Sequence, residues 1–409
     1  MTMGDLRRFH VLVASYGVSS FGSYLNMVAL NLFVYEATGS AVATGLFMVL
    51  RMTCGFIAGL LGGVVAARLP RKAVMISCDA VQAGVLLTFA VVPQTVRLDL
   101  LPVVAVSTGL LSTTSAVLLR SSVPELVGPE HSLRANGLLV TSRAVAMVAG
   151  FATAGVLVSW LGYQAAFGVN AGTFAVSAVI LAVLALRFAP RTTGETEERL
   201  GYRARTRLTV AALVAAPAVL AITVIRAVDA FGSASHQVGI PIYSTQLRPD
   251  DPASFAGNFY AAWAVGLFTA HQLVTRLYRS GRRHDEWAFV AGTAVMSAAF
   301  IAGFAGIPLP WVLLVALVAG MADGFTEITY TTRVQAEPEP ARGYFFGLTA
   351  MAENAGLGIG MVVASGLLEA WQPFWVAAVM HGLVVVLALG YLAVALTRRS
   401  RRASELIGS

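Results

Sequence analysis

The chain consists largely of apolar runs that are each long enough to cross a membrane. About a dozen runs of roughly 20 residues follow one another between short polar stretches. Charged residues make up 12% of the chain and hydrophobic residues 57%, whereas soluble domains contain roughly 25% charged residues. A soluble globular fold is therefore excluded, and the sequence predicts an all-α membrane protein with twelve transmembrane helices. The predicted spans are residues 10–35, 41–66, 74–93, 100–119, 137–160, 164–186, 212–238, 255–278, 287–306, 309–332, 344–368 and 374–396.

The positive charges are distributed unequally between the loops on the two sides of the predicted membrane. Of the 28 Lys and Arg residues, 23 fall in the loops on the side of the N-terminus, and only Arg97 and Arg248 fall in the opposite loops. This asymmetry follows the positive-inside rule and places both termini in the cytoplasm. The basic residues behind the net charge of +7 thus orient the protein in a plasma (inner) membrane through their uneven placement. No nucleic-acid partner is expected.

The longest polar stretch, Pro190 to Arg207, divides the predicted spans six and six. It gives an N-terminal half of residues 1–189, a cytoplasmic linker of residues 190–208 and a C-terminal half of residues 209–409. Basic loops recur at matching places in the halves, as RLPRK from Arg68 and RLYRSGRR from Arg276. A weak repeat of this kind is typical of a transporter built from two parallel six-helix halves.

Several loop patterns resemble those of the major facilitator superfamily, within its branch of enterobactin-exporter-like and drug-exporter-like proteins. Gly63 to Lys72 reads GVVAARLPRK and is similar to the family's G-x-x-x-D-R-x-G-R-K loop, with Ala67 and Pro70 in place of the acid and the glycine. Gly150 to Gly155 reads GFATAG, where antiporters of the superfamily often carry G-P-x-x-G-G. The resemblance covers nearly the whole chain and implies the major facilitator fold, with two halves that rock to give alternating access.

The basic loops are candidates for gating. Cationic side chains at a helix end can pair with carboxylates and carbonyls of the other half and hold the cytoplasmic side shut. The alternative is that these charges only orient the protein in the membrane. The gating candidates are Arg68, Arg71, Lys72 and Arg342.

Charged residues inside the spans are the most informative for function, because each costs roughly 2.5 to 3.5 kcal/mol at the centre of a bilayer. The predicted spans hold two more acids than bases. The surplus must be protonated, hydrated or matched by a cationic substrate. The acids are Asp79, Asp229, Asp323, Glu327 and Glu353, and the bases are Arg51, Arg143 and Arg226.

Four predicted spans carry polar side chains three or four residues apart, on one face of each helix. These stripes are Ser15, Ser19, Ser23 and Asn26; Thr108, Ser112 and Ser115; Thr223, Arg226, Asp229, Ser233 and His236; and Asp323, Glu327 and Thr331. The family resemblance independently puts these four helices around the substrate pathway, and neighbouring aromatic residues favour a partly apolar cargo. The substrate-binding candidates are Tyr24, Asn26, Arg51, Ser112, Arg226, Asp229 and Phe231.

A carboxylate in a low-dielectric cavity can carry a proton. Asp323 and Glu327 lie one turn apart and repel each other, so we expect one of them to hold a proton near neutral pH. Glu327 is the preferred carrier, with Asp323 as its partner and Glu353 in reserve. Arg226 is expected to keep Asp229 ionised, for substrate contact or as a structural pair.

Other residues and function classes receive a plainer interpretation. Asp79 is interpreted as a loop-facing structural partner near the cytoplasmic end of its span. The six histidines are scattered with no close pair, so no metal site is expected. The single lysine, Lys72, lies outside any phosphate-binding motif, which excludes an ATP-driven pump. No catalytic residue and no cofactor are predicted.

Together these features predict a secondary transporter that exports an amphipathic small molecule or peptide-like compound in exchange for protons. The proton gradient is its driving force, membrane lipid surrounds it, and a monomer is expected. Uptake by proton symport is the main alternative, and a non-transporting membrane receptor is a weaker one.

Overall fold

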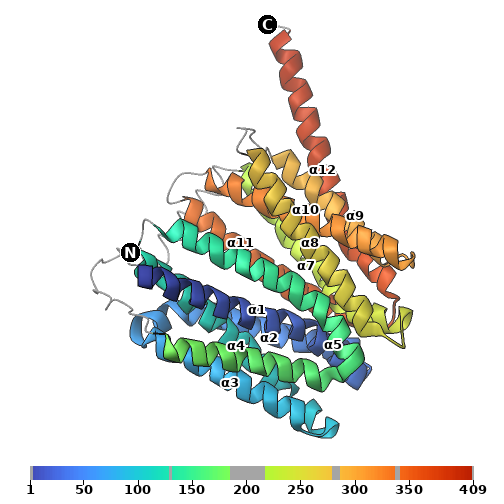
Figure 1. The fold of residues 1–409 in the computed structure, drawn as a ribbon. Helices are drawn as coiled ribbons and strands as arrows, with labels where there is room; N and C mark the ends of the chain where they lie inside the picture. The colour runs from blue at the N-terminus through green and yellow to red at the C-terminus, as the bar shows by residue number, and fades with distance from the viewer. Residues whose placement is uncertain (1–2, 129–130, 185–216, 279–285, 337–340, 408–409) are drawn as a thin grey trace. The chain divides into compact units, whose positions relative to one another are not determined.

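The computed structural model describes residues 3–128, 131–184, 217–278, 286–336 and 341–407, and within these ranges all regular secondary structure is helical (Figure 1). Long apolar segments between Gly, Pro and polar residues form these helices, as the sequence predicts. They are α1 (Met3–Thr38), α2 (Ala41–Arg68), α3 (Arg71–Val91), α4 (Gln94–Val127), α5 (Ser132–Val183), α7 (Pro217–Leu247), α8 (Pro252–Tyr278), α9 (Glu286–Gly303), α10 (Leu309–Gln335), α11 (Ala341–Leu368) and α12 (Pro373–Ile407).

Helix α5 contains two of the twelve predicted spans. Its 52 residues are interrupted at Gly162, whose backbone has φ 78° and ψ 175°. Glycine adopts this left-handed conformation without a steric penalty, so the chain can turn there between two helical arms. The arms correspond to the predicted spans 137–160 and 164–186, and the helices therefore account for all twelve.

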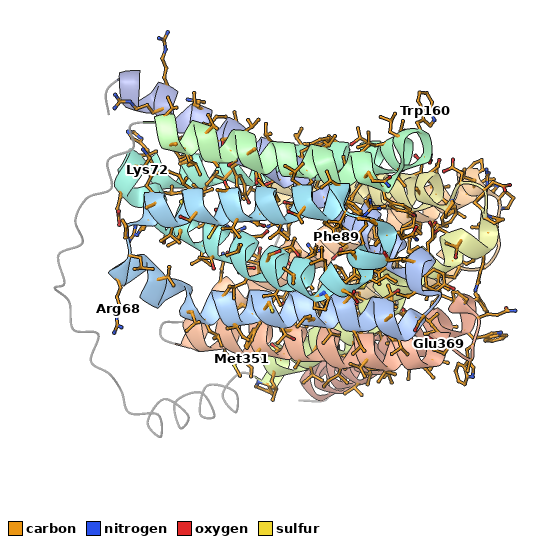
Figure 2. The ribbon with its side chains drawn as sticks, turned by 90° about the horizontal axis from the view of Figure 1, so that it is seen from below. Arg68, Lys72, Phe89, Trp160, Met351 and Glu369 are labelled. Atoms are coloured by element: carbon orange, nitrogen blue, oxygen red, sulfur yellow. The ribbon has the colours of Figure 1, made fainter. Side chains whose placement is uncertain are left out.

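The outer surfaces of the helices are apolar. Among the described residues, nine helices, with α5 counted once, are long and apolar enough to cross a membrane, and Trp287–Gly303 is a shorter apolar helix. Large apolar side chains point outward, as Trp160 does with 82% of its surface exposed, whereas Phe89 lies in the interior with none exposed (Figure 2). Exposed apolar patches of this extent fit a lipid environment.

Contacts between residues divide the chain into two compact units. The N-terminal unit consists of Met1–Gly194 together with Ile240–Ala261, and the C-terminal unit consists of Glu195–Gly239 together with Ala262–Ser409. The turn between α7 and α8 therefore packs with the N-terminal unit, while the remaining parts of both helices belong to the C-terminal unit.

Each unit has its own apolar core. In the N-terminal unit α1 and α5 lie side by side, and Phe33 packs edge-on against Phe89 and Phe167 with ring centroids 5.6 Å from each. In the C-terminal unit, Phe289 of α9 packs against Tyr330 of α10 with ring centroids 5.7 Å apart. These cores hold the helices that carry the polar side chains described next.

Candidate functional site

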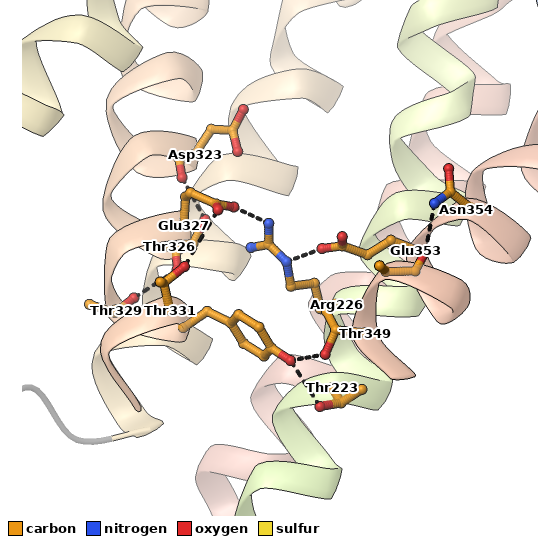
Figure 3. Close-up of polar contacts among 12 residues, drawn as sticks. Thr223, Arg226, Asp323, Thr326, Glu327, Thr329, Thr331, Thr349, Glu353 and Asn354 are labelled. Atoms are coloured by element: carbon orange, nitrogen blue, oxygen red, sulfur yellow. Dashed lines mark hydrogen bonds and ion pairs between the residues drawn. The ribbon is translucent and has the colours of Figure 1, made fainter. Parts of the chain in front are cut away.

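A single arginine joins three helices of the C-terminal unit. Arg226 of α7 lies between Glu327 of α10 and Glu353 of α11 (Figure 3). Its Nη2 forms an ion pair with Glu327 Oε2, and its Nε forms a second one with Glu353 Oε1. The guanidinium also lies 5.0 Å from the ring centroid of Tyr330. Because its cation is shared by two carboxylates, Arg226 fixes the relative positions of the three helices.

The expected pairing of Arg226 with Asp229 is wrong. Although the residues are one turn apart on α7, the long arginine side chain reaches across to α10 and α11. The buried Oδ1 of Asp229 has no hydrogen-bond partner among the residues that the structure describes. Asp229 thus lacks the direct ion pair with Arg226 that the sequence predicted.

The sequence predicts that Glu327 and Asp323 repel each other, and within the described ranges the structure gives only one of them an ion-pair partner. Glu327 holds an ion pair with Arg226, so its charge is compensated. Asp323, one turn earlier on α10, forms no ion pair with Arg226. Asp229, Asp323, Glu327 and Glu353 thus all lie near one guanidinium, and among the described residues only Glu327 and Glu353 form ion pairs with it.

A chain of hydroxyl groups lies beside this cluster. Thr223 Oγ1 is 3.1 Å from the Tyr330 hydroxyl, which in turn contacts Thr349 Oγ1 (Figure 3). Sequence analysis did not assign Tyr330 a hydrogen-bonding role or single out Thr349. Tyr330 lies three residues after Glu327, and this spacing on one helix face was the available signal.

The N-terminal unit contains a cavity of about 380 Å³ between its helices. Hydroxyl groups, aromatic rings and four charged side chains line it. The polar lining residues are Ser15, Tyr16, Ser19, Ser20, Ser23, Tyr24, Arg51, Asp79, Gln82, Ser112, Thr113, Ser115, Arg120, Arg143 and Ser177. Three serines of the predicted stripe on the first span therefore line the same cavity as Ser112 and Ser115 of the fourth.

Asp79 lies in this cavity and not in a loop, which corrects the sequence interpretation. Helix α3 begins at Arg71, so Asp79 is more than two turns inside it, and only 4% of the residue is exposed. Ser177 Oγ donates a hydrogen bond to Asp79 Oδ2 over 2.6 Å, and Ser15 Oγ donates to Ser177 Oγ over 3.2 Å. A buried acid with hydroxyl partners is thus a functional candidate that sequence reasoning undervalued.

The remaining substrate-binding candidates have different surroundings. Ser112 Oγ donates a hydrogen bond to Gln82 Oε1 over 2.6 Å, and both line the cavity. Arg143 Nε donates to the Tyr24 hydroxyl over 2.7 Å. Asn26 is buried and does not line the cavity. Phe231 lies on α7 in the C-terminal unit, so the structure does not bring it together with the cavity residues.

Two gating candidates have their observed partners in the N-terminal unit. Arg71 Nη1 lies 2.7 Å from Glu125 Oε1, and Lys72 Nζ donates to the Ala182 carbonyl oxygen over 3.0 Å. These contacts tie α3 to α4 and to the end of α5. Arg68 is exposed at the end of α2 (Figure 2). The side chain of Arg342 lies outside the described residues.

Two histidines form a close pair, contrary to the sequence-based expectation. His236 Nδ1 of α7 lies 3.2 Å from His381 Nε2 of α12, and His381 Nδ1 lies 3.3 Å from Ser297 Oγ. Both rings are buried, and Phe300 stacks on His236 with centroids 3.7 Å apart. No group of three metal-ligating side chains occurs in the part of the chain that the structure describes.

Twelve helical segments in the described chain, most of them apolar, with charged and hydroxyl side chains gathered between the helices of each unit, define a multi-pass membrane transporter. The chain belongs to the Major Facilitator Superfamily, whose sequence model matches residues 12–341. The protein is therefore a membrane transporter of this type and not an enzyme.

Similar proteins agree with this assignment. The chain is 24% identical to the uncharacterized MFS-type transporter YfiS of Bacillus subtilis (strain 168) over 398 residues, which cover 92% of this chain and 90% of that protein.

Solved structures show the same fold at low sequence identity. The nucleoside transporter NupG superimposes with a TM-score of 0.73 at 16% identity, over 96% of this chain and 99% of that one. A bacterial homolog of the human lysosomal transporter Spinster gives 0.72 at 14% identity, over 97% and 98%. The peptide transporter POT gives 0.72 at 13% identity, over 96% and 94%.

Proposed function

We propose that the protein exports an amphipathic organic compound, such as a drug or natural product, in exchange for protons. It acts by alternating access in the plasma (inner) membrane, as a monomer with both termini in the cytoplasm. The proton gradient, and no bound cofactor, supplies the driving force. The resemblance of its loops to those of enterobactin-exporter-like and drug-exporter-like proteins supports export.

The cluster around Arg226 carries this proposal. Asp229, Asp323, Glu327 and Glu353 would together leave three negative charges uncompensated by the single guanidinium if all were ionised. Charges inside a membrane protein are expensive and mark proton or ion pathways. Protons that bind this cluster from one side of the membrane and leave it to the other side would couple the proton gradient to the change between outward-open and inward-open conformations.

The lining of the N-terminal cavity supports an amphipathic cargo. Apolar side chains, including Leu12, Met27 and Phe174, alternate there with serine and tyrosine hydroxyls. Pockets of this mixed character bind organic molecules through apolar contact and orient them with a few polar groups.

A transport assay tests the proposal. Growth protection of cells that overproduce the protein, against a panel of toxic compounds, first identifies a transported compound. In proteoliposomes we then expect that compound to move against its own concentration gradient and in the direction opposite to proton flow. Its transport should stop when an ionophore dissipates the proton gradient.

Two other outcomes would contradict the proposal. Movement in the same direction as the protons would establish uptake by symport. Failure to move any compound, with protein-free liposomes as the control, would favour a non-transporting receptor.

A further inference from the structure

We infer that the cavity of the N-terminal unit binds an acidic group of the transported compound, such as a carboxylate, and that Arg51 is its main contact. This inference rests on the proposed transport function and names the chemical class of its cargo. It follows from the charge of the cavity lining and from the surroundings of one arginine.

Arg51 is the least compensated of the arginines inside the predicted spans. Arg226 has two carboxylate partners, and Arg143 donates to the Tyr24 hydroxyl. For the Arg51 side chain, neither an ion pair nor a hydrogen bond is found within the described ranges, yet it lines the cavity. A guanidinium inside a membrane protein needs an anionic or polar partner, and a ligand in the cavity would supply one.

The rest of the lining is also positive and rich in hydrogen-bond donors. Arg51, Arg120 and Arg143 face a single acid, Asp79, which already accepts a hydrogen bond from Ser177. Tyr24 accepts a hydrogen bond from Arg143, but its phenol carries no charge. The positive charge of Arg143 is therefore not neutralised by this contact. Arginines together with serine and tyrosine hydroxyls can bind the oxygens of a carboxylate by charge-assisted hydrogen bonds.

The backbone beneath Arg51 is held in a fixed position. Helix α4 approaches α2 so closely that a Cβ atom at Gly109 would overlap the carbonyl oxygen of Arg51. Only glycine permits this crossing, which holds the backbone of Arg51 against α4, the helix that carries Ser112 and Thr113 of the lining. A binding group on a rigid element loses less conformational entropy when its ligand binds.

The position of Arg51 argues against a role in membrane orientation. Orienting charges lie in loops and near the ends of spans. Arg51 lies well inside α2, between Ala41 and the helix end at Arg68. Recognition of a ligand accounts for a cation at this depth.

Matched pairs of an acid and its amide test this inference on the purified full-length protein in detergent. The probes are naphthalene-2-carboxylate and its carboxamide, octanoate and octanamide, and hippurate and hippuramide, and the readout is the melting temperature as each probe is titrated. We expect at least one acid to raise the melting temperature of the wild type at concentrations where its amide does not.

Two substitutions identify the contact. Arg51→Gln is expected to weaken binding of that acid by about tenfold or more, while Arg51→Lys retains part of it because the charge remains. Arg7→Gln, which removes an exposed arginine near the N-terminus, is the matched control and should bind as the wild type does.

The inference is overturned if no acid stabilises the wild type, or if acids stabilise Arg51→Gln and the wild type equally. These outcomes are separate from failure of the proposed function. A protein that binds acids through Arg51 and yet moves none of them against a gradient would contradict proton-coupled transport alone. A protein that transports compounds lacking any acidic group, independently of Arg51, would contradict this inference alone.

Discussion

The two partners of Arg226 decide which carboxylates of the C-terminal unit remain uncompensated. Glu327 and Glu353 each form an ion pair with Arg226. Asp229 has a buried Oδ1 without a hydrogen-bond partner in the described part of the chain. Protonation would remove a buried charge that has no ion pair of its own among the described residues, so we propose Asp229 in place of Glu327 as the proton carrier.

Conservative substitutions of these two acids separate their roles. Asp229→Asn is expected to abolish accumulation against a gradient in proteoliposomes while exchange without a gradient continues, because the asparagine cannot take up a proton. Glu327→Gln is expected to lower the melting temperature by a few degrees through loss of its ion pair, with gradient-driven accumulation retained. Loss of coupling in Glu327→Gln alone would return the carrier role to Glu327.

Helix α5 packs closely against the first turns of α8 within the N-terminal unit. A Cβ atom at Gly257 would overlap the backbone of Gly155, and one at Gly155 would overlap the carbonyl oxygen of Ala253. Ser159 Oγ also donates a hydrogen bond to Asp251. The proposed rocking of residues 1–189 against residues 209–409 would separate this contact, because α5 and α8 belong to different halves of that division.

Enlarging one of these glycines should therefore open the contact. We expect Gly257→Val to increase the rate at which a cysteine at the buried Ala253 reacts with a membrane-impermeant maleimide from outside. The increase is about tenfold if the substitution lowers the free energy of opening by roughly 1.4 kcal/mol. Gly168→Val is the matched control, since a Cβ atom there meets nothing within 4 Å. An unchanged labelling rate in Gly257→Val would mean that the contact does not limit access.

The distribution of charge over the whole chain makes a prediction about membrane topology. Cysteines placed at Ser40 and Pro249 should react only from outside the cell, and a cysteine at Thr193 only from the cytoplasm, because basic loops stay on the cytoplasmic side. The measurement is labelling of intact cells and of inverted vesicles with an impermeant reagent. Labelling of the cysteine at Thr193 from outside would contradict the proposed orientation, and Thr193 itself lies outside the described residues.

The sequence by itself determined the helices and the fold class. Apolar runs of sufficient length can form little else in a membrane, because their backbone groups must be satisfied within each helix. It also located the charged residues of the cluster around Arg226, because an acid or arginine inside an apolar span is conspicuous. Asp323, Glu327 and Glu353 were found in this way.

Only the tertiary structure decided which of these groups are partners. Arg226 pairs with residues 101 and 127 positions away, not with Asp229 one turn along its own helix. His236 and His381 meet across 145 positions, and Asp79 faces Ser177 across 98. Helical periodicity fixes which face of a helix a side chain occupies, but the partner across that face depends on which helices pack together and at what depth.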